Sequence, residues 1–312
     1  MSIFKSFKNL IRKIVFNPFG YDIVPLDSRL KTNNKKAKVK PDGLADRKFD
    51  LSLYAEHYGE NAIKNRSFYN VGAGPNFYHP AWTNVDHPSE WYGKEHVHIA
   101  WDMLALTALP IKDETAQLIY SSYALEHITD EACQNFLNEA HRALLEGAHL
   151  RIIVPNVDIY YSAFRAGERD PFYKKKNDNT KYPNAKYVRN PNEASLAQNF
   201  IWTFASSVSE LHVDGSPERV SDSELEKVIA DQGLEAALDY CTAKCSLDVQ
   251  RRHPGNHINW YHQKKLESML RKAGFADVYR SDTQQSQAVV LRDLSLFDFR
   301  RPEIALYMEA IK

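Results

Sequence analysis

The chain has few cysteines and no long apolar run. Its 312 residues include three cysteines, Cys133, Cys241 and Cys245, which are too few for a disulfide framework and indicate a reducing compartment. Cys241 and Cys245 are four residues apart, but no second pair completes a zinc site, so buried thiols are expected. No apolar run approaches the roughly 20 residues needed to span a bilayer. These absences favour a cytoplasmic protein. A length of 312 residues can hold one large domain, or a domain with an insertion.

The formal net charge is zero, but the charges are unevenly distributed. Residues 1–40 contain ten Lys or Arg and two Asp, a net charge of +8 (10 − 2), so the remainder carries −8. Within this part, residues 1–16 place apolar side chains on one face of a predicted helix and basic side chains off it. Such a helix binds either a membrane interface or a protein surface. Peripheral contact with the inner face of the membrane and docking on the domain or on a partner subunit of an oligomer therefore remain alternatives.

The most informative stretch is residues 68–86, FYNVGAGPNFYHPAWTNVD. An apolar run ends in Gly72 and Gly74, whose missing side chains let the backbone approach a ligand closely. A second short apolar run ends in Asp86, which is placed to accept hydrogen bonds from ribose hydroxyls. The dinucleotide fingerprint is incomplete, because Phe77 replaces its third glycine and Asp86 follows Gly72 by only fourteen residues. The pattern favours a nucleoside without phosphates over NAD, although such glycines also occur for packing alone.

Three further strand-like runs carry polar side chains at or near their ends. They are residues 96–103, with Asp102; residues 117–128, with Ser121 and Ser122; and residues 149–158, with Asp158. Between the last two runs, residues 130–145 have the apolar spacing of an amphipathic helix. Because ligands of open α/β sheets bind at the carboxyl ends of the strands, these side chains are candidates for one site.

Four segments, residues 70–76, 83–87, 101–128 and 139–158, together resemble the class I S-adenosylmethionine (SAM)-dependent methyltransferases of the type 11 kind. The likeness is greatest to members that look like saccharide-tailoring enzymes of polysaccharide-synthesis clusters. It covers about half of the chain and rests on the order and spacing of the segments. One departure is Pro75-Asn76, which follows the second glycine where family members often have another small residue. The resemblance implies an α/β fold with a Rossmann-like seven-stranded sheet and a terminal antiparallel hairpin.

The remaining segments fit that fold. Residues 156–258 interrupt the alternation of strands and helices, so we expect a large, mostly helical insertion after the fifth strand that forms a lid or a substrate region. Residues 260–273 predict a helix, and residues 276–282 and 303–312 predict the closing strands. The expected organisation is a basic amphipathic helix and linker at 1–45, a SAM-binding half at 46–155, the insertion at 156–258, and the C-terminal helix and closing strands at 259–312.

The resemblance implies that SAM is the cofactor and that strand ends hold it. The backbone at the two glycines would lie against its methionine and ribose portions, and Asp86 would bind the ribose hydroxyls. Asp102 and the backbone of Met103 would bind the adenine, and two serines just past the fourth strand would line the site near the sulfonium. The implied cofactor-binding residues are Gly72, Gly74, Asp86, Asp102, Met103, Ser121 and Ser122. For both aspartates, a turn at the end of a strand is the structural alternative.

In a methyl transfer to a hydroxyl group, a base that removes the hydroxyl proton as the new bond forms speeds the reaction. His127, which follows the fourth strand in the sequence LEH, is the first candidate for this base, and Asp158 is the second. Other candidates are His212, His257 and His262. His253, His257 and His262 are also close enough in sequence to suggest metal ligands. Without an evident carboxylate partner for these histidines, we expect no metal.

The function implied by the resemblance is O-methylation of a saccharide or nucleotide-sugar hydroxyl in surface polysaccharide biosynthesis. Methylation of another small molecule and a non-catalytic SAM-binding scaffold are the alternatives. Nucleic acid is not expected as a partner, because the turn after the fourth strand reads SSYA and lacks the N/D-P-P-Y/F motif of DNA amino-methyltransferases. The expected partner is a small-molecule or glycan acceptor.

Overall fold

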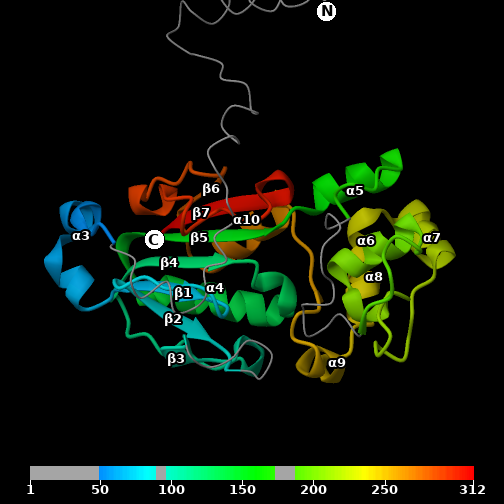
Figure 1. Cartoon of the computed structure of the whole chain (residues 1–312), viewed down its shortest axis with the longest axis horizontal. Coiled ribbons are helices and arrows are strands. Elements are labelled where there is room, and N and C mark those ends of the chain that lie inside the picture. Colours follow the sequence, from blue (N-terminus) through cyan, green and yellow to red (C-terminus); the bar gives the residue numbers. More distant parts are fainter. Residues whose placement is uncertain (1–48, 89–95, 173–186) are drawn as a thin grey trace, which may run out of the picture. The chain divides into compact units, whose positions relative to one another are not determined.

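A mixed β-sheet forms the centre of the described part of the chain. The computed structural model describes residues 49–88, 96–172 and 187–312 (Figure 1). The predicted N-terminal helix at 1–16 and the linker up to residue 45 lie outside these ranges. Within them, seven strands are arranged in the order β3-β2-β1-β4-β5-β7-β6. The strands are β1 (Phe68–Val71), β2 (Trp82–Asp86), β3 (Ile99–Ala100), β4 (Ala116–Ser122), β5 (Leu144–Pro155), β6 (Asp277–Ser281) and β7 (Ala305–Ile311).

The directions of the strands confirm the predicted Rossmann-like sheet with an antiparallel end. Strands β1 to β5 pair in parallel, and β7 runs antiparallel to both of its neighbours, β5 and β6. One detail differs from the prediction: the third strand is only two residues long, whereas the sequence pattern extends over 96–103. The closing strands are joined by the long segment 282–304, as their predicted ranges, 276–282 and 303–312, require.

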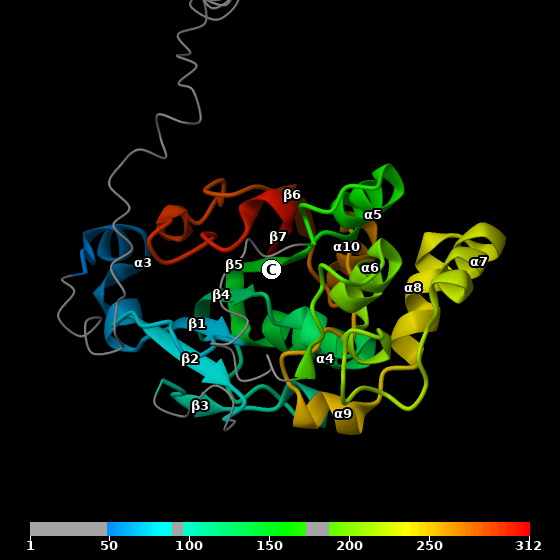
Figure 2. The same cartoon turned by 45° about the vertical axis from the view of Figure 1, so that its right-hand side comes forward.

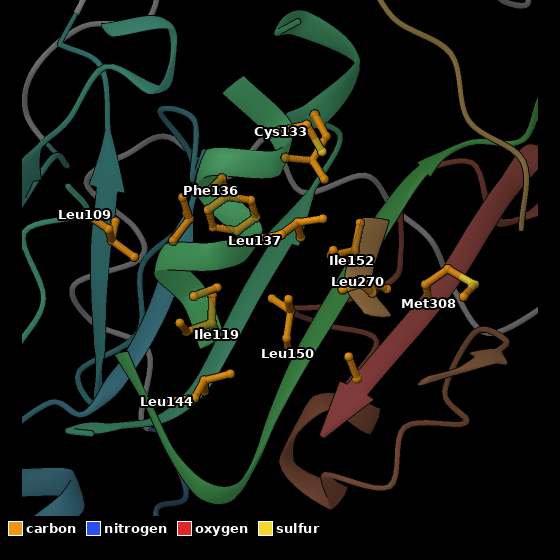
Figure 3. Packing of buried hydrophobic residues seen from close by; sticks show 14 of the residues in the cluster. Leu109, Ile119, Cys133, Phe136, Leu137, Leu144, Leu150, Ile152, Leu270 and Met308 are labelled. Carbon is orange, nitrogen blue, oxygen red and sulfur yellow. The ribbon is translucent and has the colours of Figure 1, made fainter. Parts of the chain in front are cut away.

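Strand residues alternate between two hydrophobic layers. In β4, Ile119 belongs to one layer and Leu118 to the other, as the two-residue period of a strand requires. The first layer contains α4 (Asp130–Ala143) and α10 (Gln263–Lys272), and Figure 3 shows Phe136 of α4 facing the strands within it. The second layer contains α3 (Ser52–Lys64) and the 3-10 helix η9 (Val289–Arg292). Helical segments therefore cover both faces of the sheet, as a parallel sheet requires.

A buried arginine joins the parallel part of the sheet to its antiparallel end. Arg151 of β5 has a fully buried side chain, and its guanidinium forms ion pairs with Asp298, at 2.5 Å, and with Glu309 of β7. The same guanidinium donates to Ser281 Oγ and to the carbonyl oxygen of Asp282, each at 2.8 Å. Because a buried charge is tolerated only when it is paired and hydrogen-bonded, this network fixes the segment after β6 against β5.

The helix predicted at 260–273 begins at Gln263, three residues later than its sequence pattern suggests. The N-cap is His262, whose Nδ1 accepts a hydrogen bond from the backbone N–H of Lys265 at 2.9 Å. The preceding Tyr261 is extended and forms a parallel bridge with Asn156, at the end of β5. Its buried ring lies in the first hydrophobic layer, and the residue itself precedes the helix.

The insertion predicted after β5 is mostly helical, as expected. It contains α5 (Val157–Ala166), α6 (Leu196–Phe204), η8 (Ser206–Val208), α7 (Asp222–Gln232), α8 (Leu234–Ala243) and α9 (Leu247–Arg252). These helices gather on one side of the sheet in both views (Figures 1 and 2). The boundaries of the predicted domains remain predictions.

The insertion has a hydrophobic core of its own. Phe164 of α5 stacks on Phe200 of α6 with ring centroids 5.0 Å apart, and Tyr160 contacts Phe204 edge to face. Phe204 is buried in this core, so its ring serves packing within the insertion. Cys241 is buried in the same core, and burial raises the pKa of its thiol to about 12. No helix in the described ranges is long and apolar enough to cross a membrane.

Candidate functional site

The turn after β1 contains two glycines with different surroundings. Both have a positive φ, +72° at Gly72 and +64° at Gly74, a conformation that side chains with a Cβ atom disfavour. A Cβ atom on Gly72 would lie 2.3 Å from the Cβ atom of Ala124, so the first glycine is required by packing. At Gly74 no described atom lies within 4 Å of such a Cβ atom. The backbone of this turn is therefore packed on one side and open to a ligand at the second glycine.

Asp86, at the end of β2, holds this turn in place. Its Oδ2 accepts a hydrogen bond from the backbone N–H of Gly74 at 2.7 Å, and its Oδ1 accepts one from the N–H of His87 at 2.7 Å. Burial raises the pKa of the Asp86 carboxyl, while these two hydrogen bonds act in the opposite direction. A carboxylate has about four acceptor positions, so the bonds leave capacity for ribose hydroxyls. Asp86 therefore forms the strand-end turn that was the alternative to cofactor binding, and its contact with the ribose remains a prediction.

The turn after β3 lies beside the glycine turn. Asp102 caps the 3-10 helix η4 (Met103–Ala105), and its Oδ1 accepts from the backbone N–H of Leu104 at 2.9 Å. The Cε atom of Met103 lies 3.8 Å from the position that a Cβ atom would take on Gly72. Asp102 therefore forms the turn contact that was the alternative to cofactor binding. The proximity of Met103 to Gly72 brings the ends of the first and third strands together. The adenine contacts of both residues remain predictions.

Ser121 and Ser122 are the last two residues of β4, whereas the sequence suggested that they lie beyond the strand. Ser121 is buried, and its Oγ has no hydrogen-bond partner among the described residues. The chain then turns sharply at Tyr123, which has a φ of +54° and donates its N–H to the carbonyl oxygen of Ile153 at 2.8 Å. Non-glycine residues in this region are strained, and such strain is frequent at functional sites. The turn carries Ala124 against Gly72.

The first candidate base follows immediately, in the 3-10 helix η5 (Leu125–His127). Nδ1 of His127 lies 2.8 Å from the carbonyl oxygen of Asn256, so Nδ1 carries the proton and the lone pair is on Nε2. Burial lowers the pKa of His127, and the carbonyl groups of Asn256 and Tyr123 oppose that shift. The imidazole is therefore neutral near pH 7 and able to accept a proton.

The preceding residue, Glu126, was not a predicted site residue. It is 1% exposed, and neither of its carboxylate oxygens has a hydrogen-bond partner among the described residues. Burial raises the pKa of Glu126 to about 8. The only signal in the sequence is its place next to His127 after a strand, which also fits an ordinary helix start.

The segment that returns from the insertion clamps η5 through four hydrogen bonds. The carbonyl oxygens of residues 125 to 128 each accept one bond, at 2.8 to 3.1 Å. In that order, the donors are Tyr261 Oη, Ile258 N, Gln250 Nε2 and Asn259 Nδ2. The end of the insertion therefore fixes the backbone that carries Glu126 and His127.

The other candidate bases lie in different environments. Asp158 is exposed in the first turn of α5, where its N–H donates to Oδ1 of Asn156, and its role as a base remains a prediction. Burial lowers the pKa of His212 to about 4. His253 pairs with Asp214 at 3.0 Å, and His262 pairs with Glu235 at 2.9 Å. The suggested trio of His253, His257 and His262 is therefore divided, and His257 lies instead beside His127, with ring centroids 4.9 Å apart.

Comparison with known proteins finds likeness among solved structures. No family model and no curated protein matches the chain. A SAM-dependent methyltransferase of Thermotoga maritima, described as a possible histamine N-methyltransferase, is 16% identical with a TM-score of 0.35, over 78% of this chain and 81% of that one. A SAM-dependent methyltransferase of Mesorhizobium loti is 13% identical with a TM-score of 0.35, over 78% and 90%. One of Aquifex aeolicus is 12% identical with a TM-score of 0.33, over 88% and 99%. Because these identities and TM-scores are low, the function has to be argued from the residues of this chain. The order of its strands and the antiparallel end of its sheet define a Rossmann-like fold.

Proposed function

We propose that the protein is a class I SAM-dependent methyltransferase that transfers a methyl group to a hydroxyl of a saccharide or nucleotide sugar. The observation that carries this proposal is the convergence of three strand ends at the glycine turn. Gly72 adjoins Met103 and Ala124, while Asp86 holds the N–H of Gly74. A turn that is open at its second glycine, next to a carboxylate with remaining acceptor positions, suits a nucleoside without phosphates.

The residues present fit SAM. At Gly74 no described atom lies within 4 Å of an added Cβ atom, so the backbone is open there. The hydroxyl of Ser121, which has no partner among the described residues, supplies a polar group, and the carboxylate of Asp86 supplies an acceptor for ribose hydroxyls. We infer that these residues and the Asp102–Met103 turn hold the cofactor. When bound, SAM supplies an electrophilic methyl group, and the protein's task is to position the acceptor in line with it.

We infer that His127 is the base that accepts the hydroxyl proton. Its Nδ1–H is directed to the carbonyl oxygen of Asn256, which leaves the lone pair on Nε2, and its lowered pKa keeps that lone pair available near pH 7. The choice of a saccharide hydroxyl rests on the resemblance of residues 70–158 to saccharide-modifying members of the family. Surface polysaccharide biosynthesis is the corresponding context that we propose.

Calorimetric titration tests the cofactor. We expect SAM to bind and NAD not to bind, and Asp86→Asn to weaken SAM binding by at least tenfold. The matched control is Asp277→Asn, because Asp277 is an exposed aspartate on β6, at the other edge of the sheet. Absence of SAM binding by folded protein, or equal weakening in both variants, would refute the cofactor assignment.

Turnover tests the enzyme against the non-catalytic scaffold. With nucleotide sugars and glycans as acceptors, we expect formation of S-adenosylhomocysteine by the wild type. We expect His127→Ala to keep its affinity for SAM and to lose turnover, whereas His57→Ala, an exposed histidine on α3, keeps both. Full turnover in His127→Ala would show that another group is the base or that no base is needed. SAM binding without turnover on any acceptor would favour the non-catalytic scaffold.

We also propose that the protein acts in the cytoplasm and that residues 1–16 contact a membrane surface. The support is the small number of cysteines and the basic amphipathic pattern of that segment. Sedimentation of full-length protein with anionic liposomes tests the contact. Equal sedimentation of the wild type and of Leu10→Glu would contradict it.

A further inference from the structure

The carboxylate of Glu126 is buried, and among the described residues the charge of Arg300 favours its ionised form. Both oxygens lack hydrogen-bond partners there, and the residue is 1% exposed. Burial of an unpaired carboxylate is strongly unfavourable, so the group either keeps its proton or faces a cation. Two imidazoles, those of His127 and His257, lie next to it.

One nitrogen of each imidazole and one oxygen of Glu126 all lie within 4.8 Å of one another. No other group of three such side chains is found in the part of the chain that the structure describes. With bond lengths of about 2.1 Å and tetrahedral angles, two ligands of a zinc ion are roughly 3.4 Å apart. Starting from spacings of at most 4.8 Å, each ligand atom has to move inward by about 1 Å or less.

The hydrogen bonds around the two rings fix which nitrogen of each carries the proton. Nδ1 of His127 lies 2.8 Å from the carbonyl oxygen of Asn256, and Nδ1 of His257 lies 2.6 Å from the carbonyl oxygen of Thr203. Each Nδ1 therefore carries the proton, and each ring has its lone pair on Nε2. Histidines that bind metals characteristically donate their other ring N–H to a carbonyl or carboxylate oxygen in this way.

The backbone of all three residues is fixed. The carbonyl oxygen of Glu126 accepts from Ile258 N at 2.8 Å, and that of His127 accepts from Gln250 Nε2 at 3.0 Å. The N–H of His257 donates to Ser206 Oγ at 2.9 Å, and its carbonyl oxygen accepts from the N–H of Ser206 at 2.8 Å. Residues 131 positions apart in the sequence are thus held together by the return of the chain from the insertion.

We propose that Glu126, His127 and His257 bind one divalent transition-metal ion. Two imidazoles with one carboxylate suit zinc and its neighbours in the first transition row, whereas magnesium and calcium prefer oxygen ligands alone. Three protein ligands leave a coordination position for an oxygen of water or of a bound acceptor, as in catalytic zinc sites. Ala124, two residues before Glu126, contacts Gly72, so the metal would lie near the glycine turn. The proposal stands on these three side chains and does not require the methyltransferase function.

The test uses untagged full-length protein that has been treated with a chelator and dialysed. We expect Co²⁺ alone to bind with one-to-one stoichiometry, to give the visible absorption of a cobalt site with imidazole ligands, and to be displaced by Zn²⁺. Glu126→Gln keeps the shape of the side chain, and His257→Ala removes one ring; we expect each to bind Co²⁺ at least tenfold more weakly. Glu60→Gln and His57→Ala, which change exposed residues of α3, are the matched controls and should bind as the wild type does.

Absence of one-to-one binding by folded protein, or equal affinity in the wild type and the two site variants, would overturn the metal site. A SAM titration of the same samples separates this result from the proposed function. Metal binding without SAM binding would retain the metal site and refute the cofactor assignment. SAM binding without metal binding would retain the cofactor assignment and refute the metal site.

Discussion

Replacement of Gly72 by alanine tests whether the glycine turn is packed as the structure indicates. The positive φ of +72° costs a residue with a Cβ atom about 1–2 kcal/mol. The new methyl group would lie 2.3 Å from the Cβ atom of Ala124, and overpacking of this kind costs about 1–3 kcal/mol. We therefore expect Gly72→Ala to lower the free energy of unfolding by about 2–5 kcal/mol.

Two other glycines separate the backbone strain from the steric overlap. Gly74, with φ +64°, and Gly147, with φ +75°, have no described atom within 4 Å of an added Cβ atom. Alanine at either position should cost only the strain of about 1–2 kcal/mol. The difference between Gly72→Ala and these variants then measures the contact with Ala124. We expect Gly74→Ala also to weaken SAM binding, and Gly147→Ala, in the first part of β5, to leave it unchanged.

Urea unfolding of four proteins completes the test: the wild type, Gly72→Ala, Ala124→Gly and the double variant. Removal of the Ala124 methyl group relieves the overlap, so the double variant should be more stable than the sum of the single effects predicts, by about 1–3 kcal/mol. Additive effects would show that the two residues do not touch. The convergence of strand ends, and with it the proposed site, would then lose its basis.

Two further predictions concern buried charges. Arg151→Met leaves Asp298 and Glu309 buried without their cation, so we expect the free energy of unfolding to fall by about 3–5 kcal/mol. The control Arg165→Met breaks an exposed ion pair and should change the free energy of unfolding by about 0–1 kcal/mol. Equal losses of the two variants in urea unfolding would contradict this prediction. Because burial raises the pKa of Asp86, its carboxylate takes up a proton at a higher pH than an ordinary aspartate, and SAM affinity should fall on acidification from above the usual value of 3.8. Calorimetry across acidic pH checks this, and Asp86→Asn should lack that dependence.

Much of the fold could be predicted because the sequence carries it in local patterns. Short apolar runs that end in glycine or polar residues predict strands, and the spacing of residues 130–145 predicts α4. The predictions were wrong where tertiary contacts, and not the local pattern, determine the conformation of a residue. Trp260 and Tyr261 have the spacing of a helix, but Tyr261 bridges to Asn156, and His262 caps the helix that follows. Ser121 and Ser122 look like loop residues, yet the pairing of β4 with β5 includes both.

The candidate site could be predicted only in part, for the same reason. Gly72, Gly74 and Asp86 lie within one short stretch, and the hydrogen bond from Gly74 to Asp86 joins them. Glu126 and His257 are 131 residues apart, and no local pattern relates them. Their proximity depends on the insertion returning to the end of β4, where Ile258 donates its N–H to the carbonyl oxygen of Glu126. A contact of this kind is a property of the folded chain.

The two proposals for His127 make different demands on the same atom. As a base, the ring needs the lone pair of Nε2 to accept a proton; as a metal ligand, it uses that lone pair to bind the ion. Both cannot hold in one molecule at one time. If His127 is the base, protein freed of metal should keep its turnover, and added Zn²⁺ should inhibit it. If His127 is a ligand, turnover should depend on the metal, and His257→Ala should lose activity together with His127→Ala. Turnover measured with and without chelator in these two variants therefore decides which role the fixed Nδ1–H of His127 serves.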